Sequence, residues 1–135
     1  MAVLVLTNAK ITVNSVVLSD HATTVTLNYE VDSVEVTGFG AGGHTFTGGL
    51  QNNSCEITFN QDFATSNVEA TVYPLVGTTT TVEIIPVSTT VSATNPKYTI
   101  STAYLAAHTP VAGKVGELAT TSLTFTGGTL VKALV

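Results

Sequence analysis

The chain has 135 residues, which suits one domain that buries about two-thirds of its unfolded surface in a core. Only 10% of the residues are charged, the four basic residues are all lysines, and the formal net charge is −5. Because phosphate binding needs clustered Lys or Arg side chains, this pattern argues against a tightly held nucleic acid.

β-Branched residues dominate the composition. Thr, Val and Ile make up more than a third of the chain. These side chains lose rotamer freedom in helices and pack well on a pleated sheet, so the composition predicts a mostly β fold. Thr, Ser and Asn take the polar positions that charged residues normally cover. Such a surface fits either a subunit buried against partners or a protein that acts outside the cytoplasm.

Strands are predicted over most of the chain from the alternation of apolar and polar residues and from the turn residues between the runs. The clearest case is residues 24–31, where four apolar residues alternate with polar neighbours. The expected strands cover residues 3–6, 10–18, 24–31, 34–36, 55–60, 79–87, 97–105 and 117–126. The last six residues, 130–135, form an apolar tail.

Residues 38–50 have a different composition. Six glycines lie here, with Phe39 and Phe46 among them, which predicts a long flexible loop carrying two exposed aromatic side chains. A loop of this length in a compact domain is usually functional or ordered by a partner. Residues 38–43 also match the glycine spacing of a dinucleotide-binding loop, but no helix follows, and pyrophosphate binding needs one. No cofactor is therefore predicted.

One short helix is predicted over residues 66–76. Ser66 and Glu69 have the spacing of a capping box, in which the two side chains satisfy free backbone N–H groups of the first turn. Pro74 removes a backbone hydrogen bond and Gly77 favours a helix end, so we expect only two or three turns.

No set of residues predicts an enzyme or a metal site. Ser19, Asp20 and His21 are the residue types of a hydrolase triad, but consecutive residues do not form a proton relay. The three histidines are far apart and have no partner at metal-ligand spacing. Cys55 has no second cysteine to pair with, and its apolar alternation predicts a small buried hydrophobic residue.

The N-terminal residues predict no export signal. They carry no basic region and too short an apolar run for a signal peptide, and no stretch reaches the roughly 20 apolar residues of a membrane helix. We expect synthesis in the cytoplasm and no membrane partner.

Several segments resemble the siphophage major tail tube protein family. Residues 16–21, running into 25–27, resemble the opening of many phage tail structural proteins. The run 34–38, the glycine-rich loop and then Phe46 to Leu50 resemble the strand, long loop and turn of the tube proteins. The single helix and the closing strand that ends in Thr126-Gly127-Gly128 are also similar.

The resemblance implies a β-sandwich or barrel-like domain over residues 1–135 with one short flanking helix. Six copies would form a ring, rings would stack into a long non-contractile tail tube of the virion, and inner strands would pair between copies into a continuous β-barrel. DNA would pass through the lumen during delivery without specific binding. Tape measure, terminator and distal tail proteins would be the other partners. Closure between copies would also use the sheet edges that an open sheet leaves unpaired.

Two sets of residues are predicted to carry this function. The glycine-aromatic loop and the apolar ends would make contacts between subunits and rings, through Phe39, Phe46, Gly48, Gly49, Leu50, Val3, Leu4, Leu6, Leu130 and Val131. The alternative is that Phe46 and the chain ends cap the core. Carboxylates facing the lumen would repel DNA, and the candidates are Glu30, Asp32, Glu35 and Glu56. For the first three, the alternative is a solvated hairpin end.

Two other functions fit the same composition. A capsid-decorating or tail-decorating β domain would bind a preformed lattice without polymerising. A pilin-like or adhesin-like β module would act outside the cell, which the missing signal peptide disfavours.

Overall fold

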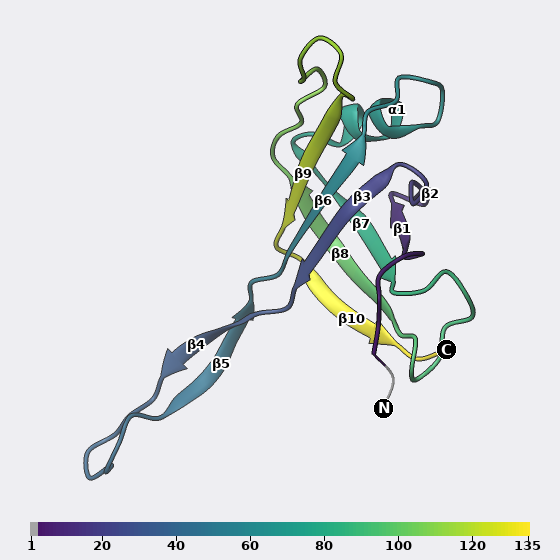
Figure 1. Cartoon of the computed structure of the whole chain (residues 1–135). Coiled ribbons are helices and arrows are strands. Elements are labelled where there is room, and N and C mark those ends of the chain that lie inside the picture. The colour runs from purple at the N-terminus through teal and green to yellow at the C-terminus, as the bar shows by residue number, and fades with distance from the viewer. Residues whose placement is uncertain (1–2) are drawn as a thin grey trace.

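The computed structural model describes residues 3–135 and is mostly β (Figure 1). Met1 and Ala2, which enter the signal-peptide prediction, lie outside the described residues. The strands are β1 Lys10–Val13, β2 Val16–Val17, β3 Ala22–Asn28, β4 Val31–Glu35, β5 Phe46–Gln51, β6 Ser54–Asn60, β7 Thr78–Ile85, β8 Lys97–Leu105, β9 Thr120–Thr126 and β10 Thr129–Ala133. The helix α1 covers Val68–Val72 and continues as a 3-10 turn over Tyr73–Leu75. The predicted fold class, mostly β with one short helix, is confirmed.

Eight strands form one open antiparallel sheet. Their order is β2-β1-β7-β8-β9-β6-β3, with β10 pairing β8 as well, and β4 and β5 form a separate hairpin. One edge of β8 has two neighbours, because residues 97–101 pair with β10 and residues 104–105 pair with β9. The sheet therefore divides into a layer of β3, β6 and β9 and a layer of β1, β2, β7, β8 and β10, which Figure 1 shows as front and back.

The two layers meet at a glycine pair between β9 and β10. Both strands pair with β8 in one continuous register, so they form a single strand with a kink. Gly127 and Gly128 have φ values of 76° and 82°, which favour glycine. A Cβ on Gly128 would lie 2.2 Å from the carbonyl oxygen of Ser101. The predicted apolar tail is thus largely a strand, and the glycine pair turns a corner where the sequence predicted an end.

The core lies between the layers, and α1 contributes to it. The buried cluster comprises Ile11, Val13, Leu18, Cys55, Ile57, Phe59, Val68, Val72, Leu75, Val82, Ile84, Ile100, Ala103, Leu105, Leu123 and Phe125. Cys55 is fully buried, as predicted, and this burial raises the pKa of its thiol to about 12.

The helix begins differently from the prediction. Its N-cap is Asn67, which makes no capping hydrogen bond with its side chain, and Ser66 has a φ of 64°. The predicted capping box is therefore wrong. Asp62 takes over part of its role, because its carbonyl oxygen accepts the backbone N–H of Glu69 at 3.1 Å. Gly77, with a φ of 82°, follows the helical segment.

Two further predictions need correction. Residues 3–6, predicted as a strand, lie outside any strand. The predicted loop over residues 38–50 is shorter, because Phe46–Gln51 pairs with β4 and only residues 36–45 connect the two strands. Glycines at 48 and 49 suggested a loop, but backbone hydrogen bonds to β4 hold them in a ladder.

Candidate assembly surfaces

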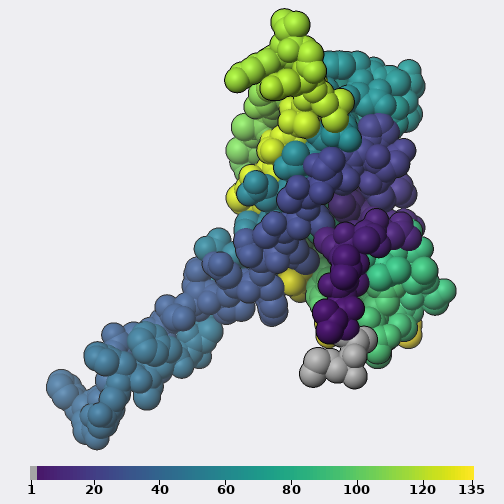
Figure 2. Space-filling view, in the orientation of Figure 1, coloured from purple at the N-terminus to yellow at the C-terminus, as the bar shows by residue number. Residues whose placement is uncertain are grey.

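The β4–β5 hairpin, residues 31–51, projects from the body of the molecule and is called the arm below (Figures 1 and 2). Every residue of its two strands is exposed except the half-buried Gln51. An isolated two-stranded hairpin is at best marginally stable in water. The arm therefore gains little stability from packing within the described residues.

Apolar side chains concentrate on the arm. Phe39 at the tip is fully exposed, and Phe46 and Leu50 are 61% and 81% exposed. Gly48 and Gly49 lie opposite β4, and a Cβ on Gly49 would come within 3.1 Å of the Val34 side chain. The structure thus brings five of the predicted contact residues onto one projecting element.

Val3, Leu4 and Leu6 precede β1 at the base of the body, where both chain ends are found (Figure 1), whereas Leu130 and Val131 lie at the start of β10 beside the root of the arm. Leu4, Leu6 and Leu130 line a groove of about 450 Å³, called the apolar groove below. Val3 and Val131 are also exposed but do not line it. The complete lining is Leu4, Leu6, Ala9, Val25, Leu27, Tyr29, Ile84, Pro86, Tyr98 and Leu130.

A buried amide fixes the root of the arm. Asn53 is 1% exposed, and its Nδ2 donates to Gln51 Oε1 at 2.8 Å and to the carbonyl oxygen of Gly128 at 3.1 Å. Its Oδ1 accepts the backbone N–H of Glu30 at 3.3 Å. Gln51 Oε1 in turn accepts the N–H of Leu130 at 2.9 Å. The arm root is therefore bonded to the corner between β9 and β10, a role that no sequence pattern indicated.

The outer face of β3, β6 and β9 is polar and almost uncharged. Strand register places on this face Thr24, Thr26, Asn28, Ser54, Glu56, Thr58, Asn60, Thr120, Ser122, Thr124 and Thr126, called the polar face below. Glu56 is the one charged member of this set. Hydroxyl and amide side chains bond to one another across the strands, as between Thr58 Oγ1 and Ser122 Oγ at 3.0 Å.

The four predicted lumen carboxylates do not lie together. Glu56 is on the polar face, whereas Glu30 precedes β4, and Asp32 and Glu35 are on β4 itself. The Glu35 carboxylate accepts hydrogen bonds from His44 and Thr37, which hold its pKa below the usual range.

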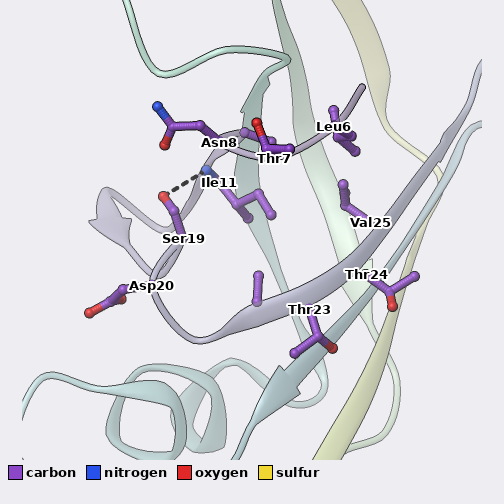
Figure 3. Close-up of a pocket in the computed structure, with 11 residues that line it drawn as sticks. Leu6, Thr7, Asn8, Ile11, Ser19, Asp20, Thr23, Thr24 and Val25 are labelled. Atoms are coloured by element: carbon purple, nitrogen blue, oxygen red, sulfur yellow. Dashed lines mark hydrogen bonds between the residues drawn. The ribbon is translucent and has the colours of Figure 1, made fainter. Parts of the chain in front are cut away.

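A second groove, of about 580 Å³, opens between β1 and β3, where the sheet is not closed (Figure 3). Ser19 lies in it, and its Oγ accepts the backbone N–H of Ile11 at 3.1 Å, while Asp20 points away. His21 bonds to Asp20 at 2.9 Å and to Asp62 at 2.7 Å. The hydroxyl of Ser19 therefore bonds the segment after β2 to β1.

Within residues 3–135, no three His, Cys, Asp or Glu side chains are grouped so that they could hold a metal ion. In the same part of the chain, no helix has the length and apolar character needed to cross a bilayer.

Comparison with known proteins identifies the fold. No protein-family model and no curated protein sequence matches the chain. Among solved structures, a chain of the extended sheath–tube complex of an extracellular contractile injection system matches with a TM-score of 0.68 and 11% identity, over 98% of this chain and 93% of its own length. The sheath/tube terminator of such a system matches with a TM-score of 0.72 and 10% identity, over 98% and 97%. A chain of a native gene transfer agent virion matches with a TM-score of 0.64 and 12% identity, over 93% and 95%.

The chain shares its fold with subunits of these assemblies. The predicted resemblance to tail tube proteins is thus confirmed for the fold. The matches come from contractile injection systems and from a gene transfer agent, so they do not single out siphophages.

Proposed function

We propose that the chain is a structural subunit of the tail tube of a long, non-contractile phage tail, and that it has no enzymatic activity. The observation that carries the tube assignment is the likeness to a sheath–tube complex over 98% of the chain. The non-contractile type rests on the resemblance of the sequence to siphophage tube proteins. Copies would form rings, six to a ring, and the rings would stack into the conduit for DNA delivery. Residues 1–135 would act as one tail-tube-like domain in the virion.

The open sheet supports ring formation. β3 and β2 are the ends of the strand order, and β10 pairs with β8 alone. Unpaired strand edges invite pairing with another chain, and closing a barrel removes them. We propose that edges of neighbouring copies pair into a continuous β-barrel around the lumen.

The composition of the polar face supports the proposal that this face lines the lumen. The face carries Thr, Ser and Asn side chains and no lysine that could bind DNA phosphates, and the Glu56 carboxylate repels those phosphates. We therefore propose Glu56 as a lumen-facing carboxylate. Glu30, Asp32 and Glu35 stay predictions for the lumen, since they belong to the arm and its root.

The arm and the apolar ends supply the proposed contacts between subunits and rings. The residues are those predicted from the sequence: Phe39, Phe46, Gly48, Gly49 and Leu50 on the arm, and Val3, Leu4, Leu6, Leu130 and Val131 at the base. Tape measure, terminator and distal tail proteins remain the expected further partners.

A second candidate is a tube terminator, the subunit that ends a tube. The match to a sheath/tube terminator, with a TM-score of 0.72, favours it. A terminator would form a single ring and would not stack further.

Negative-stain electron microscopy of the purified chain at increasing concentration tests the proposal. Hollow tubes or stacks of rings with a central channel are expected for a tube subunit. Single rings at every concentration would favour the terminator. Monomers that also fail to extend isolated tail-tip complexes would contradict both and favour a decorating domain.

A further inference from the structure

The chain before β1 lies along the free edge of β3. β3 ends the strand order, so one side of its backbone has no neighbouring strand in the described chain. The groove of about 580 Å³ separates the two segments: residues 6–9 line it on one side and residues 22–25 line it on the other (Figure 3). Residues 3–9 are called the strap below and lie on the surface of the body (Figure 2).

Leucine side chains attach the strap to the body. Leu4 and Leu6 line the apolar groove together with Val25 of β3. Leu6 and Val25 also line the groove between β1 and β3, where Figure 3 shows them directed toward one another. Val3 and Val5 line neither groove and are 85% and 76% exposed. Alternate residues of the strap thus face the body, as in a strand with one covered face.

The backbone of the strap is fixed at one point. The carbonyl oxygen of Asn8 accepts the backbone N–H of Ser88 at 2.8 Å. Within the described chain, no backbone hydrogen bond joins residues 3–7 to β3. Side-chain contacts therefore hold the strap beside β3, and Asn8 is the point about which it can turn away.

Such a cover suits a strand edge that must pair later. Free strand edges invite pairing with other chains, and natural proteins cover them with loops. Leu4 and Leu6 are 55% and 52% exposed, so the strap gains only part of the free energy of burying these side chains. A strand of another copy would form a ladder of backbone hydrogen bonds with β3, and the strap forms none. The strap can therefore protect the edge in the free chain and still yield to a partner strand.

We propose that the strap is an autoinhibitory segment, which covers the edge of β3 in the free chain and leaves it when β3 pairs with a strand of a second copy. Release turns the strap about Asn8 and uncovers Val25, while Leu4 and Leu6 become free for other contacts. The inference rests on the proposed pairing of strand edges in a ring and adds the step that controls this pairing. It gives residues 3–6 a role in the free chain, before any contact between subunits forms.

A reversible covalent lock tests this step. In the double variant Leu6→Cys/Val25→Cys, oxidation with diamide joins the strap to β3, and Cys55 cannot compete because it is fully buried. Non-reducing electrophoresis identifies the monomer in which the bond lies within one chain. This oxidised monomer should fail to assemble at concentrations where the reduced chain assembles, and dithiothreitol should restore assembly. Leu6→Cys alone, treated in the same way and separated as monomer, is the matched control and should assemble before and after oxidation.

The outcomes separate this inference from the proposed function. An oxidised chain that assembles like the reduced chain overturns the inference and leaves the tube subunit standing. A cysteine pair that forms no disulfide in the free chain does the same, because the strap then does not approach β3. Wild-type chain that forms no assembly, even on isolated tail-tip complexes, overturns both. If the reduced double variant alone fails to assemble, single substitutions in the strap decide.

A concentration series with these single substitutions gives the second measure. Leu6→Ala weakens the hold of the strap on β3, so the concentration for half-assembly should fall by up to about fivefold. Val5→Ala is the matched control, because Val5 lines neither groove, and it should leave this concentration within about twofold. A rise with Leu6→Ala would mean that this residue serves only as a contact between subunits, and an unchanged value would mean that the strap does not compete for the edge. Either result overturns the inference.

Discussion

At the scale of single residues, His21 and Asp62 are the centre of a hydrogen-bonded cluster of ionisable side chains. The His21 ring bonds to Asp20 in the same turn and to Asp62, 41 residues later in the chain, beside the helix start. Asp62 also accepts the backbone N–H of Ala64 and the side-chain amide of Asn67. The cluster therefore ties the turn before β3 to the loop before α1.

This cluster predicts a pH-dependent stability. The hydrogen bonds that the His21 ring donates to the Asp20 and Asp62 carboxylates raise the pKa of His21 above 6.5. The contribution of His21 to stability is therefore fully present below pH 6.5 and is lost as the pH rises through the folded value. The bonds from Ala64 and His21 lower the pKa of Asp62 below 3.8, so its contribution is present above that value and is lost on further acidification.

Urea unfolding at pH 5.5 and at pH 8.5 checks this prediction. The free energy of unfolding of the wild type should exceed that of His21→Gln by more at pH 5.5 than at pH 8.5. The comparison of the two chains cancels the contribution of His108, because burial lowers the pKa of that residue and gives it the opposite pH dependence. An NMR titration should place the His21 pKa above 6.5. A pKa at or below 6.5, or an unchanged pH dependence in His21→Gln, would contradict the role of the cluster.

Gly128 shows how one residue sets the course of a strand. A glycine pair at a strand end reads as a break, because glycine weakens strands and favours turns. The structure uses the pair to continue the strand past a corner, where a Cβ on Gly128 would meet the carbonyl oxygen of Ser101. The contact joins residues 27 positions apart, so the sequence around Gly128 does not reveal it.

At the scale of elements, the arm depends on its root. Asn53 supplies hydrogen bonds to Glu30, Gln51 and Gly128, and it is buried. Removing one member of a buried set leaves the partners unsatisfied, which costs about 1–3 kcal/mol. Asn53→Ala should therefore lower the free energy of unfolding by about that amount and weaken self-assembly further, because the arm loses its direction.

Asn52→Ala is the matched control for this prediction. Asn52 is exposed and bonds to Glu30 through its backbone N–H, which alanine retains. The free energy of unfolding of Asn52→Ala should stay within about 0.5 kcal/mol of the wild-type value. Urea unfolding and the concentration for half-assembly measure the two effects. An Asn53→Ala chain that matches Asn52→Ala in both would show that the amide does not position the arm.

Several strands could be predicted because the alternation of apolar and polar residues is visible within each strand's own sequence. The strands over residues 55–60 and 97–105 agree with β6 and β8, since alternation records which face of a strand is buried. Residues 3–6 alternate too little and have no ladder partner in the chain, so the strand prediction fails there. Conversely, β5 was missed because its glycines carry no side-chain pattern and only pairing with β4 defines it.

At the scale of the whole molecule, the distribution of charge supports the proposal that the assembled chain forms a conduit for DNA. The polar face is nearly free of charge and contains Glu56, so six copies would line a lumen with few sites that bind phosphate. Glu56→Lys would place a ring of cations there. We expect tubes to assemble normally and DNA to leave virions built with this variant more slowly.

Ejection of DNA followed by fluorescence in vitro measures this effect. Glu117→Lys is the control, because it makes the same charge change at an exposed residue of the loop before β9, away from the polar face. Equal ejection rates for the two variants would contradict a lumen position for Glu56. Failure of Glu56→Lys alone to assemble would place this residue in a contact between subunits.

The sequence by itself determined the class of fold and the character of the surface. β-Branched composition and period-2 alternation are local properties, and they indicated a β domain with few charges and apolar segments available for partners. Tertiary structure decided how these segments combine: that Phe39 stands on a projecting arm, that Leu4 and Leu130 share a groove, and that Glu56 is separated from the arm carboxylates. The physical reason is that strand pairing and register join residues far apart in the chain, whereas periodicity reports only which side of each strand is covered.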